Sequence, residues 1–171
     1  ARKVIEYFQS KGIQVVLLSG DKQANCETVA EQLGIQEVHS EQLPSDKLKM
    51  IEKLNQRGLT AMVGDGINDA PALAKADVGI SLSGATDIAI QSAQVILMNG
   101  KLDLLPELRS ISRHTVLTIK QNLFWAFFYN VIAIPFAAMG YLKPIIAALS
   151  MAFSDIMVIG NAIRLRFKKL T

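Results

Sequence analysis

The strongest chemical signal in the sequence is the run Gly-Asp-Gly-Ile-Asn-Asp-Ala-Pro. It places Asp65 and Asp69 four residues apart, with Asn68 next to the second carboxylate. Carboxylate and amide oxygens are the ligands that Mg²⁺ prefers, and such an ion commonly assists chemistry at a phosphate group. Two glycines, Gly64 and Gly66, would let the backbone approach the phosphate closely. A surface turn that caps the next helix is the alternative, but the run follows an apolar segment and therefore favours a magnesium site.

Two further segments carry groups that suit a phosphoryl anion. Ser19, Gly20 and Asp21 directly follow the apolar run IQVVLL, and a hydroxyl with free backbone N–H groups can hold an anion there. Lys47 lies in the first turn of a predicted helix, where a cation opposes the helix dipole and so indicates an anionic partner. A plain turn and a solvated lysine remain the alternatives for these two segments.

Strands and helices alternate through residues 1–100. Continuous apolar runs predict four buried strands, at residues 13–18, 59–63, 78–82 and 94–98. Helices are predicted between them, at residues 25–33, 45–56, 69–76 and 86–93. This alternation predicts a doubly wound parallel α/β sheet, in which the active site lies at the carboxyl ends of the strands. Both Asp21 and Asp65 fall at such ends.

The rest of the chain differs in composition. Between Asn122 and Ile163 the only charged side chains are Lys143 and Asp155. Two apolar stretches, NLFWAFFYNVIAIPFAAM and PIIAALSMAFSDIMVIGNAI, are each long enough to cross the hydrocarbon core of a bilayer. They predict an α-helical two-span membrane hairpin that follows an amphipathic helix. The basic side chains after the second span place the C-terminus in the cytoplasm, together with residues 1–120.

The overall composition limits the classes of function. Of the 171 residues 50% are hydrophobic and 19% are charged, and the formal net charge is +3. No aromatic side chains interleave with a basic face, so we expect no nucleic-acid partner. Cys26 is the only cysteine, which excludes an intrachain disulfide and a CxxC metal site.

Together, the polar segments resemble the haloacid-dehalogenase-like phosphoryl-transfer fold in the version that P-type ATPases use. The resemblance implies a catalytic set that grips the phosphate, contacts the phosphoryl group and holds Mg²⁺: Ser19, Gly20, Asp21, Lys47, Asp65, Asn68 and Asp69, with Gly64 and Gly66 beside the bound cofactor. The aspartyl nucleophile of that family lies in a DKTGT segment, and no DKTG occurs here. We therefore expect the nucleophile and the ATP-binding domain to lie upstream, and this chain alone to be inactive.

The membrane half resembles copper-transporting members of the same family. In that group Tyr-Asn on one helix and Met-x-x-Ser-Ser on the next are metal-site residues, which implies ligands for the transported metal at Tyr129, Asn130, Met151 and Ser154. Asp155 stands where the second serine is expected. A thioether favours Cu(I), whereas a carboxylate also suits divalent ions. The site therefore either carries Cu(I) with Asp155 as a counter-charge or has shifted toward Zn, Co, Ni or Cd.

The resemblance as a whole implies a C-terminal fragment of a heavy-metal P-type ATPase. Its parts would be a partial phosphorylation domain (1–100), an amphipathic connecting helix (101–121), and two transmembrane helices with a basic tail (122–171). We expect ATP-driven Cu(I) export, coupled to aspartyl-phosphate formation and hydrolysis, in a multi-pass plasma-membrane protein. Expected partners are the upstream remainder, the lipid bilayer and a soluble metal chaperone. A membrane-anchored phosphatase of the same fold and a non-catalytic truncated homologue remain the alternatives.

Overall fold

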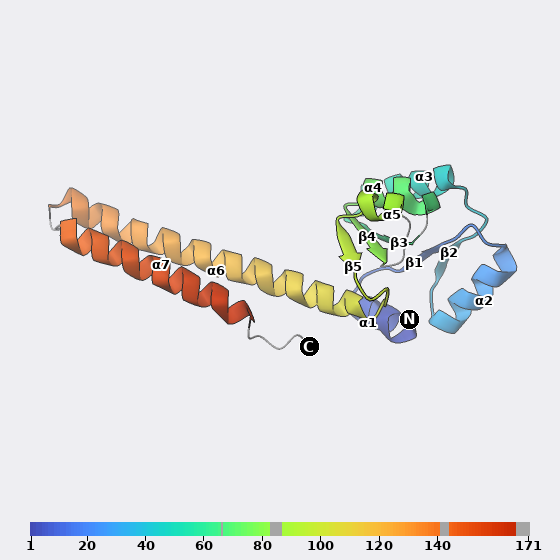
Figure 1. Ribbon diagram of the computed structural model, residues 1–171, viewed down its shortest axis with the longest axis horizontal. Helices are drawn as coiled ribbons and strands as arrows, with labels where there is room; N and C mark the ends of the chain where they lie inside the picture. Colours follow the sequence, from blue (N-terminus) through green and yellow to red (C-terminus); the bar gives the residue numbers. More distant parts are fainter. Residues whose placement is uncertain (66, 83–86, 141–143, 167–171) are drawn as a thin grey trace. The chain divides into compact units, whose positions relative to one another are not determined.

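The computed structural model describes residues 1–65, 67–82, 87–140 and 144–166. The chain divides into two compact units, Ala1–Pro106 and Glu107–Thr171, which are described separately below. The elements of the first unit, in chain order, are α1 (Arg2–Ser10), β1 (Val16–Leu18), α2 (Gln23–Leu33), β2 (Glu37–His39), α3 (Pro44–Arg57), β3 (Ala61–Gly64), a 3₁₀ turn η1 (Ile67–Asp69), α4 (Ala70–Lys75), β4 (Val78–Leu82), α5 (Asp87–Ser92) and β5 (Val95–Leu97) (Figure 1).

The described strands form two parallel sheets. One has the order β1-β2, and the other has the order β3-β4-β5. The predicted parallel α/β architecture is thus confirmed. Strands β1, β4 and β5 lie within the apolar runs that predicted them, and β3 overlaps its run and extends one residue further, to Gly64. The sequence did not indicate β2, because its three residues, Glu-Val-His, include only one apolar side chain. Its strand conformation comes from pairing with β1, which no local pattern reports.

A small apolar core lies where α3 and α4 pack against the larger sheet. Its buried side chains are Ile51, Met62, Ala72, Leu73 and Ala76. The short side chains of α4 allow close packing, and Leu73 is fully buried. Truncating a buried leucine such as this one to alanine costs about 2–5 kcal/mol of stability. The core therefore fixes α4, and with it the loop that carries the predicted magnesium ligands.

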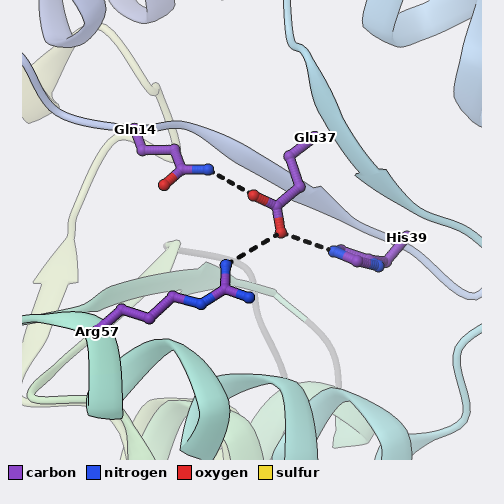
Figure 2. Close-up of polar contacts among 4 residues, drawn as sticks. All are labelled: Gln14, Glu37, His39 and Arg57. Carbon is purple, nitrogen blue, oxygen red and sulfur yellow. Dashed lines mark hydrogen bonds and ion pairs between the residues drawn. The ribbon is translucent and has the colours of Figure 1, made fainter.

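A polar cluster of four residues is shown in Figure 2. The carboxylate of Glu37, at the start of β2, accepts a hydrogen bond from Gln14 Nε2 and lies 3.0 Å from His39 Nε2. Arg57 Nη1 at the end of α3 is 3.9 Å away. The cluster joins the segment before β1 to β2 and α3. Glu37 lies at the start of β2, where it pairs in register with Val16 of β1, and His39 is the last residue of the same strand.

The second unit is a pair of helices. Helix α6 (Leu104–Ala138), whose first residues belong to the first unit, is followed by α7 (Pro144–Arg166) (Figure 1). The amide of Asn161 on α7 donates hydrogen bonds to Asn122 Oδ1 at 2.8 Å and Gln121 Oε1 at 3.3 Å on α6. The predicted amphipathic segment and the first predicted apolar helix are one continuous helix. This follows from the absence of a helix-breaking residue between them.

Many large apolar side chains of the second unit are exposed, among them Leu123, Phe124, Phe127, Val131 and Ile134. Within the described parts of the chain, no helix combines the length and the apolar character that crossing a membrane requires. The predicted pair of helices is therefore observed, and its prediction as two membrane spans is not confirmed.

Candidate functional site

The centre of the candidate site is an ion pair between α3 and η1. Lys47 Nζ donates to Asp69 Oδ1 at 2.6 Å, and each side chain is only 12% exposed. Helix α3 begins at Pro44, whose fixed φ suits a first helical turn, and Asp46 Oδ2 accepts the Leu43 N–H at 3.3 Å. This start of α3 directs Lys47 toward the end of β3. A short, largely buried, charge-assisted bond of this kind is stronger than an exposed ion pair.

Gly64 provides the space that Asp69 occupies. A Cβ on Gly64 would lie 2.8 Å from Asp69 Cβ and 3.0 Å from Asp69 Oδ2, which is closer than real Cβ atoms approach. We predicted that this glycine lets the backbone approach a phosphate. In the structure, Asp69 makes a close approach to Gly64 at the end of β3.

Two other polar residues of the predicted magnesium run, Asp65 and Asn68, are exposed. Asp65 directly follows β3 and is exposed, and Asn68 in η1 is also exposed. Gly66 lies outside the described residues. Mg²⁺ usually binds through one or two carboxylates while keeping several waters, so an exposed Asp65 beside Asp69 fits this ion. Across the described part of the chain, no group of three or more His, Cys, Asp or Glu side chains is placed to hold a metal.

The predicted phosphate-gripping turn follows β1 and is held mainly by backbone hydrogen bonds. The Ser19 N–H donates to the His39 carbonyl at 2.9 Å, and the Ser19 carbonyl accepts the Gln42 N–H at 3.0 Å. A Cβ on Gly20 would lie 3.2 Å from the Gln42 carbonyl oxygen. The loop after β2 therefore supports this turn. The sequence did not indicate a role for that loop. Glu41 within it has a positive φ of 56°, which no residue pattern predicts.

Asp21 lies two residues before helix α2 and is exposed. Its carboxylate accepts the Lys22 N–H at 2.7 Å and the Asn25 side-chain amide at 3.0 Å. The hydrogen bond from Asn25, followed by that from the Lys22 backbone, lowers the pKa of Asp21 below its usual 3.8. The Asp21 N–H also donates to Ser19 Oγ at 3.2 Å. The side chains of this turn thus bond to nearby backbone N–H groups and to Asn25 at the start of α2, and no hydrogen bond or ion pair joins them to Lys47 or Asp69 within the described residues.

The predicted ligands of the transported metal lie on α6 and α7. Asn130 is exposed and donates to the Ala126 carbonyl at 2.8 Å, and the side chain of Tyr129 lies outside the described residues. Met151 is 61% exposed, and Asp155 follows it by one helical turn on α7. Ser154 is half-buried. Among the described side chains, no hydrogen bond joins Asn130 to the α7 ligands.

Comparison with known proteins begins with the first unit. A sequence-family model for haloacid dehalogenase-like hydrolases matches residues 1–77. The match confirms the predicted haloacid-dehalogenase-like parallel α/β fold. A solved phosphatase, the 3-deoxy-D-manno-octulosonate 8-phosphate phosphatase from Moraxella catarrhalis, is 24% identical with a TM-score of 0.55, over 63% of this chain and 66% of its own. At that identity only the fold is shared.

Comparison over the whole chain gives much stronger matches. A probable copper-importing P-type ATPase A of Enterococcus hirae is 49% identical over 99% of this chain and 24% of its own length. A copper-exporting P-type ATPase of Staphylococcus haemolyticus is 45% identical over 99% of this chain and 22% of its own length. The chain is similar to heavy-metal P-type ATPases. It spans about a quarter of the length of these curated relatives.

Solved P-type ATPase structures match in three dimensions as well. A zinc-transporting PIB-type ATPase in its E2.Pi state is 34% identical, with a TM-score of 0.91, over 96% of this chain and 27% of its own. The catalytic domain of a CPx-ATPase is 37% identical, with a TM-score of 0.59, over 61% of this chain and 42% of its own. The similarity to the zinc transporter therefore extends across both the α/β unit and the helix pair.

Proposed function

We propose that this chain is part of an ATP-driven heavy-metal cation transporter of the P-type ATPase kind, with Cu(I) as the transported ion. The observation that carries this proposal is the buried Lys47–Asp69 pair beside an exposed Asp65 at the end of a parallel strand. This arrangement offers one cation for a phosphoryl anion and carboxylates for a hard metal ion. The sequence similarity to copper-transporting P-type ATPases over 99% of the chain supports it.

The proposed chemistry at the site is phosphoryl transfer. Asp65 and Asp69 would hold Mg²⁺, which supplies charge neutralisation at a phosphate when it is bound. Lys47 would contact the phosphoryl oxygens, and the Ser19–Asp21 turn would offer the anion the Ser19 hydroxyl, because the Ser19 and Asp21 N–H groups already donate within the fold. Asn68 is exposed next to Asp69 and would orient a ligand at the same edge. The aspartyl nucleophile and the nucleotide-binding domain would come from the remainder of the longer protein.

The helix pair is proposed to form the metal pathway. Tyr129, Asn130, Met151 and Ser154 would be ligands, with α6 and α7 as transmembrane helices from about residue 122 onward. Support comes from the exposed large apolar side chains on α6 and from the near absence of charge between residues 122 and 163. This division assigns residues 1–100 to the phosphorylation domain, 101–121 to a connecting helix and 122–171 to the membrane part. Residues 1–120 and the C-terminus would be cytoplasmic, at the plasma membrane.

The proposed metal is Cu(I), and the proposed direction is export. Met151 provides a soft thioether ligand, and Asp155 would act as a counter-charge one turn away. Relatives named as copper-exporting are 44–45% identical to this chain. A soluble metal chaperone would deliver the ion. The second candidate is a divalent-metal pump, favoured by Asp155 and by the similarity to a zinc-transporting ATPase.

The experiment is ATP hydrolysis by the purified full-length protein against Cu(I), Zn²⁺, Co²⁺ and Ni²⁺, with Asp65→Ala as the inactive control. Stimulation by Cu(I) that is lost in the control is the expected result. Stimulation by a divalent ion alone, followed by a switch of preference in Asp155→Ser, would replace copper with the second candidate. No metal stimulation with intact phosphatase activity would indicate a membrane-anchored phosphatase, and no activity at all a non-catalytic homologue.

The direction of transport is tested separately. Inside-out vesicles that contain the full-length protein should accumulate Cu(I) only when ATP is added. Release of preloaded copper on ATP addition would instead mean import, in line with the name of the Enterococcus hirae relative.

A further inference from the structure

Ser81 lies near the end of β4, and its hydroxyl group has no evident structural role. Its side chain is fully buried, and within the described part of the chain Ser81 Oγ has no hydrogen-bond partner. A buried polar group without a partner costs about 1–3 kcal/mol, so folded proteins rarely keep one without a reason. The surroundings of Ser81 should therefore reveal what the hydroxyl is for.

The strand register places Ser81 beside the candidate site. Ser81 on β4 pairs with Gly64 on β3. Register partners in neighbouring parallel strands project from the same face of a sheet, and the strands lie about 4.8 Å apart. The place of the missing Gly64 side chain is filled by Asp69, whose Oδ2 would lie 3.0 Å from a Cβ there. Ser81 is therefore the neighbour of the Asp69 carboxylate along the sheet.

The two oxygens of Asp69 have different surroundings. Oδ1 is bound to Lys47 at 2.6 Å, while Oδ2 is the oxygen that lies against Gly64, the register partner of Ser81. A phosphoryl anion at this edge would compete with Asp69 for the single ammonium group of Lys47. Asp69 is 9% exposed, so once Lys47 turns away its carboxylate would gain from a hydrogen-bond donor besides the Mg²⁺ ion proposed above.

We propose that Ser81 is a positioning residue for Asp69. When Lys47 turns toward a phosphoryl anion, the Ser81 hydroxyl donates a hydrogen bond to Asp69 Oδ2, directly or through one buried water. The role of the anion rests on the function proposed above, whereas the link between Ser81 and Asp69 does not.

A cycle of variants in the full-length protein tests that link without any need for ATP turnover. The variants are Ser81→Ala, Lys47→Met and the double change, and the readout is hydrogen–deuterium exchange of the segment 61–70. Ser81→Ala alone should leave exchange unchanged or slower, because it removes an unpaired buried hydroxyl. In the Lys47→Met background the same change should speed exchange about tenfold, the equivalent of one hydrogen bond to a charged group. The same effect in both backgrounds would overturn the proposal.

Kinetics of the single variants gives a second, independent test. Ser81→Ala should lower kcat about tenfold with KM for ATP unchanged, because the hydroxyl acts only after the anion has drawn Lys47 away. Ser81→Cys, which keeps a weak donor, should be intermediate. Ser92→Ala removes a hydroxyl that bonds only to the Ile88 carbonyl within α5, and it should have no effect. A wild-type kcat in Ser81→Ala would contradict the proposal.

The two tests also separate this proposal from the proposed function. If the wild-type protein hydrolyses no ATP, the proposed function fails, and the exchange cycle still decides the role of Ser81. If ATP hydrolysis is normal and the exchange cycle shows no coupling, only the role of Ser81 is rejected.

Discussion

The two units of the chain differ in where their apolar side chains lie. In the α/β unit the buried residues are apolar, apart from Asp69 with its lysine partner and Ser81. In the helix unit large apolar side chains such as Phe127 and Val131 are exposed, while the amides of Asn122 and Asn161 bond to each other between the helices. The α/β unit thus carries its own core, whereas the helix pair presents an apolar surface of the kind that a partner or a lipid phase covers.

This difference determines where a single substitution should matter. In the α/β unit, charges lie in or beside a packed core, so changes there should affect both chemistry and stability. In the helix unit the exposed side chains have little packing to lose. The predictions below test this contrast, beginning with the largest expected effect.

Asp65→Asn should separate chemistry from stability within the α/β unit. Asp65 is exposed, so the variant should fold and melt like the wild type. We expect ATP hydrolysis by the full-length protein to fall about a hundred- to a thousandfold, because a charge that neutralises a phosphate is lost. Asp103→Asn, at another exposed aspartate of the same unit, should retain activity. Equal activity of the two variants would remove Asp65 from the site.

Lys47→Met should show the cost of an unpaired buried charge. It leaves Asp69 without the Lys47 ammonium group. We expect the free energy of unfolding, measured by urea denaturation, to fall by about 3–5 kcal/mol. Lys75→Met is the matched control, because the Lys75–Glu52 pair, at 3.2 Å, is about half exposed on both sides. It should cost less than about 1 kcal/mol. Similar losses in both variants would mean that the Lys47–Asp69 pair behaves like a surface ion pair.

Gly64→Ala should disturb the same loop through steric overlap alone. The added methyl group would overlap with Asp69. We expect the free energy of unfolding to fall by about 1–3 kcal/mol and ATP hydrolysis to be reduced. At Gly58 an added Cβ meets nothing within 4 Å, and the backbone there is extended, so Gly58→Ala should not destabilise. A well-tolerated Gly64→Ala would show that the turn after β3 moves easily.

Asn161→Leu should test the polar contact in the helix unit. The change removes the hydrogen bonds to Asn122 and Gln121 and adds apolar surface to the second unit. We expect the free energy of unfolding of α6 and α7 to fall modestly, by about 0.5–1.5 kcal/mol. Circular dichroism can monitor the reversible unfolding of these helices. A loss as large as that of Lys47→Met would contradict the contrast between the units.

Asn25→Ala should give the smallest effect, visible only at low pH. Because the pKa of Asp21 is lowered in the folded protein, its contribution to stability is present above pH 3.8 and is lost as the pH falls through the lower folded value. Removing the Asn25 amide takes away the largest cause of that shift. The pKa of Asp21 should therefore rise toward 3.8, as carbon NMR of its carboxyl group can measure. No change would assign the shift to the Lys22 backbone N–H instead.

Several features of the fold followed from local patterns alone. Continuous apolar runs indicated β1, β3, β4 and β5, and the absence of proline and glycine between residues 107 and 134 indicated the long α6. These features are readable because strand and helix periodicity is carried by neighbouring residues. Strand β2 was not predicted, because its three residues show no strand-like hydrophobic pattern. Pairing with β1 is what makes it a strand. The separation of the five strands into two sheets was likewise not indicated.

The candidate site divides in the same way. Sequence by itself determined that Ser19, Asp21 and Asp65 fall at strand ends, because the residues that end a strand are its neighbours in the chain. Only the tertiary structure decided that Lys47 pairs with Asp69, 22 residues away, and that Asp69 fills the space above Gly64. Those contacts depend on where α3 docks and how the turn after β3 folds. Packing sets both, and no local pattern carries them.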